Sequence, residues 1–191
     1  MGCQFRNKHV YPHFKDKGFS VITLQGGDAI RTKVINELQK NGIVCITGVG
    51  HGESDVYTGD NLSILFKVKL YNKKEVKGKI IHLLSCVVAA KLGPDFVKKG
   101  CRAFFGYENP FSFDVEFKDI FFRCDSEIDL ALADGNTTTE VYQRASNIYT
   151  DAIEKLNDSG QFYIAGMLQR DLNILRSPAY GSMYGSQTAK L

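Results

Sequence analysis

Two short apolar segments, each ending near a reactive side chain, constrain the fold of this 191-residue chain more than any other feature. The first, IVCITGVGHGE, covers residues 43–53 and contains His51 followed by Gly52; the second, KIIHLLSC, covers residues 79–86 and ends at Cys86. Continuous apolar runs of this length are typical of strands buried in a parallel sheet. Ligands bind such sheets at the carboxyl ends of the strands. We therefore expect His51 and Cys86 to share one crevice, as the base and the nucleophile of a hydrolase.

Strand and helix patterns alternate along the chain, which predicts an α/β fold with a mainly parallel sheet and helices on both faces, a three-layer αβα sandwich. We expect a single domain over residues 1–191, in which the polar residues 1–17 form an N-terminal arm. Strands are expected at 19–24, 43–47, 62–70, 80–84 and 101–107, and helices at 28–40, 87–99, 127–133, 139–156 and 161–175. The aromatic-rich segment 115–124 fits neither pattern clearly.

Composition and charge exclude several functional classes. The net charge of +3 is too weak to predict a nucleic-acid partner, and the lysine-rich segment 67–79 fits a solvated connection before a strand. No run of eighteen apolar residues occurs, and the first thirty residues lack the apolar core of a signal peptide. We therefore expect no membrane association and a cytoplasmic location.

The five cysteines are odd in number and widely spaced, which predicts neither a disulfide framework nor a closed zinc site. Cys3 and the two histidines that follow it in the N-terminal arm fall short of a zinc motif. We expect no metal and no cofactor, and the sequence leaves a calcium requirement open. Cys45 and Cys101 lie inside apolar runs and are expected in the core, whereas Cys86 lies where a strand stops.

The surroundings of Cys86 favour a nucleophile. A thiolate is the attacking species, and the N-terminus of the helix expected at 87–99 would favour a negative sulfur. Gly52 lets backbone approach a substrate closely, so the amides of Gly52 and Cys86 are predicted to form an oxyanion hole. His82 precedes Cys86 by four residues on the same strand, roughly 13 Å away, and is too distant to be the base.

A further possibility is that the segment GVGHGE binds phosphate, as the turn of a nucleotide-binding protein does. Gly48 and Gly50 begin like a dinucleotide-binding fingerprint, but Glu53 occupies the position of the third glycine and no amphipathic helix is expected to follow. A flavodoxin-like nucleotide binder is therefore disfavoured.

The strand ending in His-Gly, followed by a strand ending in Ser-Cys, resembles the caspase/gingipain clan of cysteine peptidases, in its gingipain-like or CHAT-like branch. The segments NGIVCITGVGHGE, LLSCVVAAKLGPDFVKKGCRAFFGYENPF and DGNTTTEVYQRASNIYTDAI are similar to elements of that group in the same order. The resemblance implies a caspase-like fold and a cysteine endopeptidase with His51 as general base and Cys86 as nucleophile. It also implies backbone oxyanion donors at Gly52 and Cys86.

The resemblance also bears on substrates and partners. The loop after the strand at 101–107 often helps to form the specificity pocket of such peptidases, which makes Glu108 a candidate to bind a basic side chain. Glu53 and Asp55 are alternatives, either as pocket acids or as groups that orient His51. The expected partner is a protein or peptide substrate, with room for a regulatory partner chain. The alternative function is an inactive or partner-activated scaffold that docks through the aromatic stretch 104–122.

Overall fold

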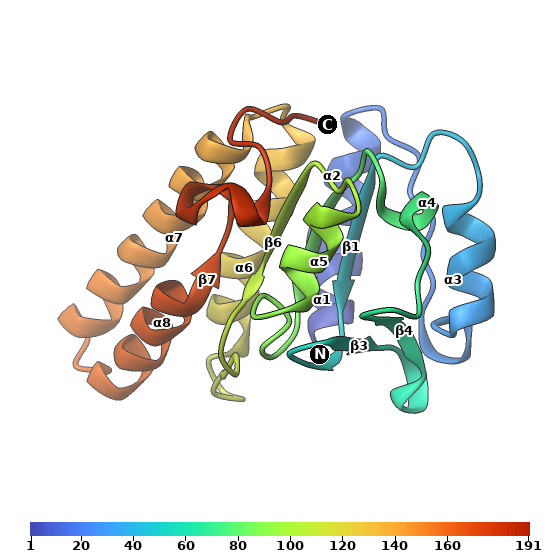
Figure 1. Ribbon diagram of the computed structural model, residues 1–191. Helices are drawn as coiled ribbons and strands as arrows, with labels where there is room; N and C mark the ends of the chain where they lie inside the picture. The colour runs from blue at the N-terminus through green and yellow to red at the C-terminus, as the bar shows by residue number, and fades with distance from the viewer.

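The computed structural model describes residues 1–191, and a four-stranded sheet lies at its centre (Figure 1). The strand order is β1-β5-β6-β7; β1, β5 and β6 are parallel, and β7 runs antiparallel to β6. The strands are β1 (Cys45–Val49), β5 (Ile80–Leu84), β6 (Ala103–Tyr107) and β7 (Leu175–Arg176). The predicted mixed α/β fold with a mainly parallel sheet is therefore confirmed.

A small antiparallel sheet of order β2-β3-β4 follows β1 directly. Its strands are β2 (His51–Glu53), β3 (Val56–Thr58) and β4 (Ile64–Lys67). β2 and β3 form a hairpin with a two-residue turn at Ser54 and Asp55. In Figure 1 the arrow of β1 points down, toward the side where β3 lies, so the hairpin is at the carboxyl end of β1.

Side chains of the central strands alternate between two faces, and helices cover both. On one face Ile81 and Leu83 of β5 pack with Phe96; on the other face Ile80 and Leu84 pack with Ile128. The first face is covered by α3 (Arg31–Leu38), α4 (Lys73–Val76) and α5 (Leu92–Lys98), and the second by α6 (Lys118–Ala133) and α7 (Thr138–Asp158). All five residues of β5 are buried, as expected for an internal strand with two covered faces.

The helices after β6 form a separate packed group. α8 (Phe162–Ile174) lies against α7, and its apolar residues share a core cluster with Phe121 and Tyr149 (Figure 1). α7 begins with a capping box between Thr137 and Glu140. α6 begins at Lys118, so most of the ambiguous segment 115–124 is helical. Short 3₁₀ helices lie at η1 (Gly26–Asp28), η2 (Asp60–Leu62), η3 (Pro178–Tyr180) and η4 (Ser182–Tyr184). None of the helices is both long enough and apolar enough to cross a membrane.

The prediction of an N-terminal arm at residues 1–17 was wrong, because this segment forms two packed helices. They are α1 (Gly2–His9) and α2 (Tyr11–Asp16). Gly2 lies against Val49, where an added Cβ would come within 2.8 Å of the valine side chain. Arg6 is 1% exposed and donates to Asp125 on α6, so a charged side chain anchors α1 in the interior. Val10 and Phe14 of the same segment are buried as well, and they pack with Ala133 of α6.

Two further element predictions also failed. Residues 19–24 form no strand; Val21 instead packs against the apolar cluster of Val10 and Phe14, and the segment is absent from the sheet. The helix predicted from residue 87 begins only at Leu92. The reason is that Val87 has a left-handed φ of 62°, while its N–H donates to the carbonyl of Asn109 instead of entering a helix.

Candidate active site

The two predicted site segments lie side by side because β1 and β5 are neighbours in register. Val49 pairs with Leu84, and the Gly50 N–H donates to the Leu84 carbonyl at 3.2 Å. His51 and Cys86 each follow their paired strand-end residue by two positions. Parallel strands therefore bring both residues to the same edge of the sheet, as the sequence predicted.

Gly52 allows the two segments to touch. A Cβ at this position would lie 2.7 Å from Val88 Cγ1 and 2.9 Å from the Val56 carbonyl oxygen, and would also collide with Ser85 Oγ. Distances under 3.0 Å leave no room for any side chain. Only glycine therefore lets the backbone at this position pack directly against Ser85 and Val88.

The hairpin that carries His51 is tied to the segment that follows Cys86. The Leu92 N–H, at the start of α5, donates to the Ser54 carbonyl at 2.8 Å, and the Val68 N–H donates to the Asp55 carbonyl at 2.9 Å. The N-terminus of α5 thus holds the hairpin turn. The prediction that the next helix stabilises a Cys86 thiolate was wrong, because that helix begins six residues later. Its first N–H group, at Leu92, binds the hairpin instead.

Cys86 is the partly exposed cysteine at this edge. Its Sγ–H lies 3.8 Å from the Phe111 carbonyl, a weak hydrogen bond. By contrast, burial raises the pKa of both Cys101 and Cys124 to about 12, which keeps those thiols protonated at neutral pH. The His51 side chain is exposed and makes no hydrogen bond, to Cys86 or to any other group.

Two backbone amides fit the predicted oxyanion donors. The Cys86 N–H donates to no backbone carbonyl. Glu53 and Val56 close the two-residue turn as a hydrogen-bonded pair, so Gly52 and Tyr57 form the alternate, non-bonded pair. The Gly52 N–H therefore points away from β3. Neither amide thus has a backbone acceptor, as an oxyanion-hole role requires.

Val87, next to Cys86, has the backbone strain that often marks a functional turn. A β-branched residue with a φ of 62° is a conformational outlier, costing of order 1–3 kcal/mol. The conformation is held by hydrogen bonds from Val87 N–H to Asn109 and from Ala89 N–H to Tyr107, at 3.4 and 3.0 Å. These bonds turn the chain sharply after Cys86 and leave its thiol at the sheet edge.

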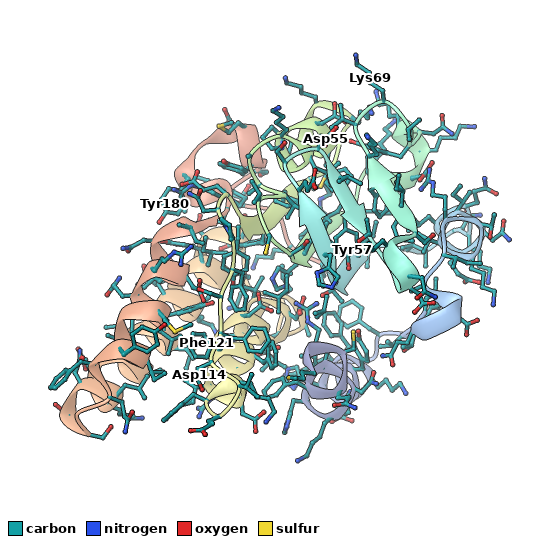
Figure 2. The ribbon with its side chains drawn as sticks, turned by 90° about the horizontal axis from the view of Figure 1, so that it is seen from below. Asp55, Tyr57, Lys69, Asp114, Phe121 and Tyr180 are labelled. Atoms are coloured by element: carbon teal, nitrogen blue, oxygen red, sulfur yellow. The ribbon has the colours of Figure 1, made fainter.

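The three candidate specificity acids lie in different settings. Glu108 forms an ion pair with Arg176, and its carboxylate is therefore already engaged. Glu53 is exposed and Asp55 half-buried, and neither carboxylate forms an ion pair or hydrogen-bonds to His51. Figure 2, seen from below, shows Asp55 on the hairpin well separated from Asp114, which precedes α6.

His82, which its sequence spacing from Cys86 excludes as the base, belongs to a buried charge cluster between the sheet and α6. Its ring hydrogen-bonds Asp125 at 3.1 Å and Asp129 at 3.0 Å, and Arg6 forms ion pairs with both carboxylates at 2.9 and 3.2 Å. All four side chains are at most 1% exposed. Sequence reasoning missed the cluster, although two aspartates four apart on the apolar face of a helix were a usable signal.

Metal and nucleotide binding find no support at this edge. No group of three or more His, Cys, Asp or Glu side chains could hold a metal ion. Cys3 lies against the Val49 carbonyl, whereas His13 bonds Asp134 at 2.9 Å, so the N-terminal residues considered as ligands face different partners. The glycines before His51 lead into β2 and not into a helix, so the anion site of a dinucleotide-binding turn is missing. Comparisons with protein-family models, curated proteins and solved structures found no match for this chain.

Proposed function

We propose that the chain is a cysteine endopeptidase with a caspase-like αβα fold, in which Cys86 is the nucleophile and His51 the general base. One observation carries the proposal. The His51–Gly52 and Ser85–Cys86 segments follow the carboxyl ends of two adjacent parallel strands, and Gly52 lies so close to Ser85 and Val88 that no side chain fits there.

The reaction follows from the groups at this edge. His51 takes the Sγ proton as the Cys86 sulfur attacks the carbonyl carbon of the scissile peptide bond, and the amides of Gly52 and Cys86 bind the resulting oxyanion. Collapse of the tetrahedral intermediate breaks the C–N bond, and the imidazolium gives its proton to the leaving amine. A thioester on Cys86 remains. Water, deprotonated by His51, attacks the thioester, releases the carboxyl product and returns the proton to the sulfur.

The side chain that the site prefers in a substrate depends on which carboxylate near the site is not already in an ion pair. Because Glu108 is paired with Arg176, a preference for cleavage after basic residues rests on Glu53 and Asp55. Both lie in the hairpin that begins at His51, within reach of a peptide bound along this edge. The mechanism needs no metal and no organic cofactor.

The test is cleavage of a diverse peptide library, read by mass spectrometry, with purified wild-type protein and single variants. Cys86→Ala should lower the rate by at least about 10³-fold, and His51→Ala by about 10²- to 10⁴-fold. Cys3→Ala is the control, a partly exposed cysteine on α1 that has no role in the proposed reaction, and should leave cleavage unchanged. Undiminished cleavage by Cys86→Ala would reject the proposal.

A second function, an inactive or partner-activated scaffold, is favoured by one observation. The Cys86 thiol is bonded to the Phe111 carbonyl, and His51 is not bonded to it. The docking surface expected at 104–122 has less support, because Phe104, Phe105 and Phe121 are fully buried. The pH dependence of Cys86 alkylation separates the two functions. A scaffold has no need of a thiol that reacts faster near neutral pH than Cys3 does.

A further inference from the structure

Residues 108–113, between β6 and α6, form a loop that covers Cys86, and we call this segment the cover loop. Three contacts place it there. The Asn109 carbonyl accepts from Val87 N–H, the Tyr107 carbonyl before the loop accepts from Ala89 N–H, and the Phe111 carbonyl accepts from the thiol. The loop as found therefore lies against the sulfur and engages the thiol as a hydrogen-bond donor.

The other contacts of the cover loop reach α8 and β7. The Glu108 N–H donates to the Ile174 carbonyl at 3.0 Å, and the Glu108 carboxylate pairs with Arg176. Arg170 donates to the Pro110 carbonyl at 3.4 Å. Figure 2 shows Asp114, the residue that follows the loop, near Phe121 of α6. The position of the loop is thus set by contacts with α8 and β7.

Among the contacts between the cover loop and α8, the one made by Asp171 is buried. Its Oδ1 accepts from the Ser112 N–H at 3.3 Å, while its Oδ2 is buried without a partner. The Ser112 Oγ is also buried without a partner. Asp171 is 0% exposed, so a fully buried carboxyl group with one unused oxygen holds the loop directly after Phe111.

The charges around Asp171 favour a neutral carboxyl group. The pKa of Asp171 is raised to about 8, mainly by burial and to a smaller extent by Asp125, against the opposing effects of the Ser112 N–H and Arg170. The remaining titratable neighbours are Cys124 on α6, Tyr107 on β6 and Tyr149 on α7, none of which is positively charged. Arg170 is thus the single cation that faces this group.

We propose that Asp171 is a positioning residue for Cys86: through Ser112 it keeps the cover loop closed over the thiol, and its release exposes and activates the sulfur. This inference rests on the proposed function for its biological meaning. It adds to that function a way in which the site is regulated. Its physical content concerns only the reactivity of Cys86, which can be measured whether or not the chain cleaves peptides.

The first experiment measures alkylation of each cysteine by iodoacetamide at pH 7, read by mass spectrometry. Asp171→Ala removes the acceptor, and the loss of one hydrogen bond shifts a two-state loop by about fivefold in population. Cys86 should therefore label about fivefold faster. Cys101 and Cys124 are buried and should stay protected, which separates loop opening from unfolding.

A pair of loop variants tests the same contact without touching the core. Ser112→Pro removes the N–H that Asp171 accepts, and should accelerate Cys86 labelling as Asp171→Ala does. Ser112→Ala keeps the N–H and removes a hydroxyl that has no partner, and should label like wild type. If Ser112→Pro also labels like wild type, the inference is overturned, even should Asp171→Ala prove too unstable to measure.

The second experiment uses pH. The pKa of Asp171 is raised to about 8 while the carboxyl group is buried, so the closed loop loses stability as the pH rises toward that value and loses no more above it. The rate of wild-type Cys86 labelling, divided by the rate of Cys3 labelling, should therefore rise up to about pH 8. Asp171→Asn mimics the neutral carboxyl group and should lack this rise. Identical profiles for the two proteins would overturn a role for Asp171 ionisation.

The outcomes separate the inference from the proposed function. If opening the loop activates Cys86 but no variant cleaves peptides, the positioning role holds and the peptidase proposal fails. If wild type cleaves and Cys86 is equally reactive in all variants, the peptidase proposal stands and the positioning role fails.

Discussion

Two histidines on neighbouring strand segments of this protein occupy opposite environments. His82, inside β5, is fully buried and bonded through both ring nitrogens to carboxylates. His51, just beyond β1, is exposed and its ring makes no hydrogen bond. The first ring cannot move or exchange partners without breaking a charge cluster. The second is free to turn toward a substrate or a thiol, which a general base must be able to do.

The comparison separates stability from reactivity. The cluster of Arg6, His82, Asp125 and Asp129 balances two positive against two negative charges in the interior and should govern the free energy of unfolding. The strand-end site contains weak contacts, an exposed ring and a strained turn, and should govern the reactivity of Cys86. The predictions below test this division, beginning with the largest expected change in stability.

Arg6→Met should cost about 3–5 kcal/mol of unfolding free energy at pH 7, because it leaves two buried carboxylates facing His82 alone. Urea unfolding followed by circular dichroism measures the change. Lys8→Met, an exposed lysine on the same helix, is the matched control and should stay within about 0.5 kcal/mol of wild type. A loss below about 1 kcal/mol for Arg6→Met would show that the cluster does not anchor α1.

The pH dependence of stability should reveal His82. Burial opposes its charge, but Asp129 and Asp125 outweigh burial and raise the pKa of His82 to about 9. A raised histidine pKa means that the folded state binds the proton more tightly. The resulting stability is complete below about pH 6.5 and is lost as the pH rises through about 9. Linkage gives a total of about 3 kcal/mol.

Unfolding at a series of pH values in wild type and His82→Gln checks this prediction. The variant should be less stable at pH 6 and should lack most of the decline toward pH 9. Asp171 contributes a decline of the same sign, because its pKa is also raised, so Asp171→Asn serves as the second reference. Parallel curves for wild type and His82→Gln would assign the decline to other groups.

Gly52→Ala tests whether the two site segments are in close contact. The added Cβ would collide with Ser85 and Val88, and overpacking of this kind costs about 1–3 kcal/mol. Gly166→Ala, in α8, is the control, since nothing lies within 4 Å of the new atom. It should be neutral or stabilise by up to about 1 kcal/mol, because alanine favours helix. A Gly52→Ala protein as stable as wild type would indicate looser packing at this edge.

The sequence predicted the parts of the fold that depend on apolar patterning. Residues 80–84 and 103–107 form buried strands because their continuous apolar runs leave few alternatives, and α7 follows from its capping box and apolar stripe. Neighbouring parallel strands then suffice to bring His51 and Cys86 to the same edge of the sheet.

The failures share a physical cause, which is that long-range polar contacts have no local pattern. The helix predicted at residue 87 is prevented by a hydrogen bond from Val87 to Asn109, twenty-two residues later. The segment predicted as an N-terminal arm is helical and packed because Arg6 forms an ion pair with Asp125, more than a hundred residues away. Asp171 lies in a segment correctly predicted as helix, yet its burial beneath the cover loop depends on tertiary structure alone.

His51→Ala should have the smallest effect on stability and the sharpest on reactivity. Because the exposed ring makes no hydrogen bond, its removal should change the unfolding free energy by no more than about 0.5 kcal/mol. At pH 7, however, Cys86 should lose any labelling advantage over Cys3, since no other histidine can take its proton. His9→Ala, an exposed histidine on α1, is the control for both measurements. A stability loss above about 2 kcal/mol would make His51 structural like His82, and unchanged labelling would deny it the role of base. Either result would remove the contrast between the two histidines, and with it the reason to place chemistry at this end of the sheet.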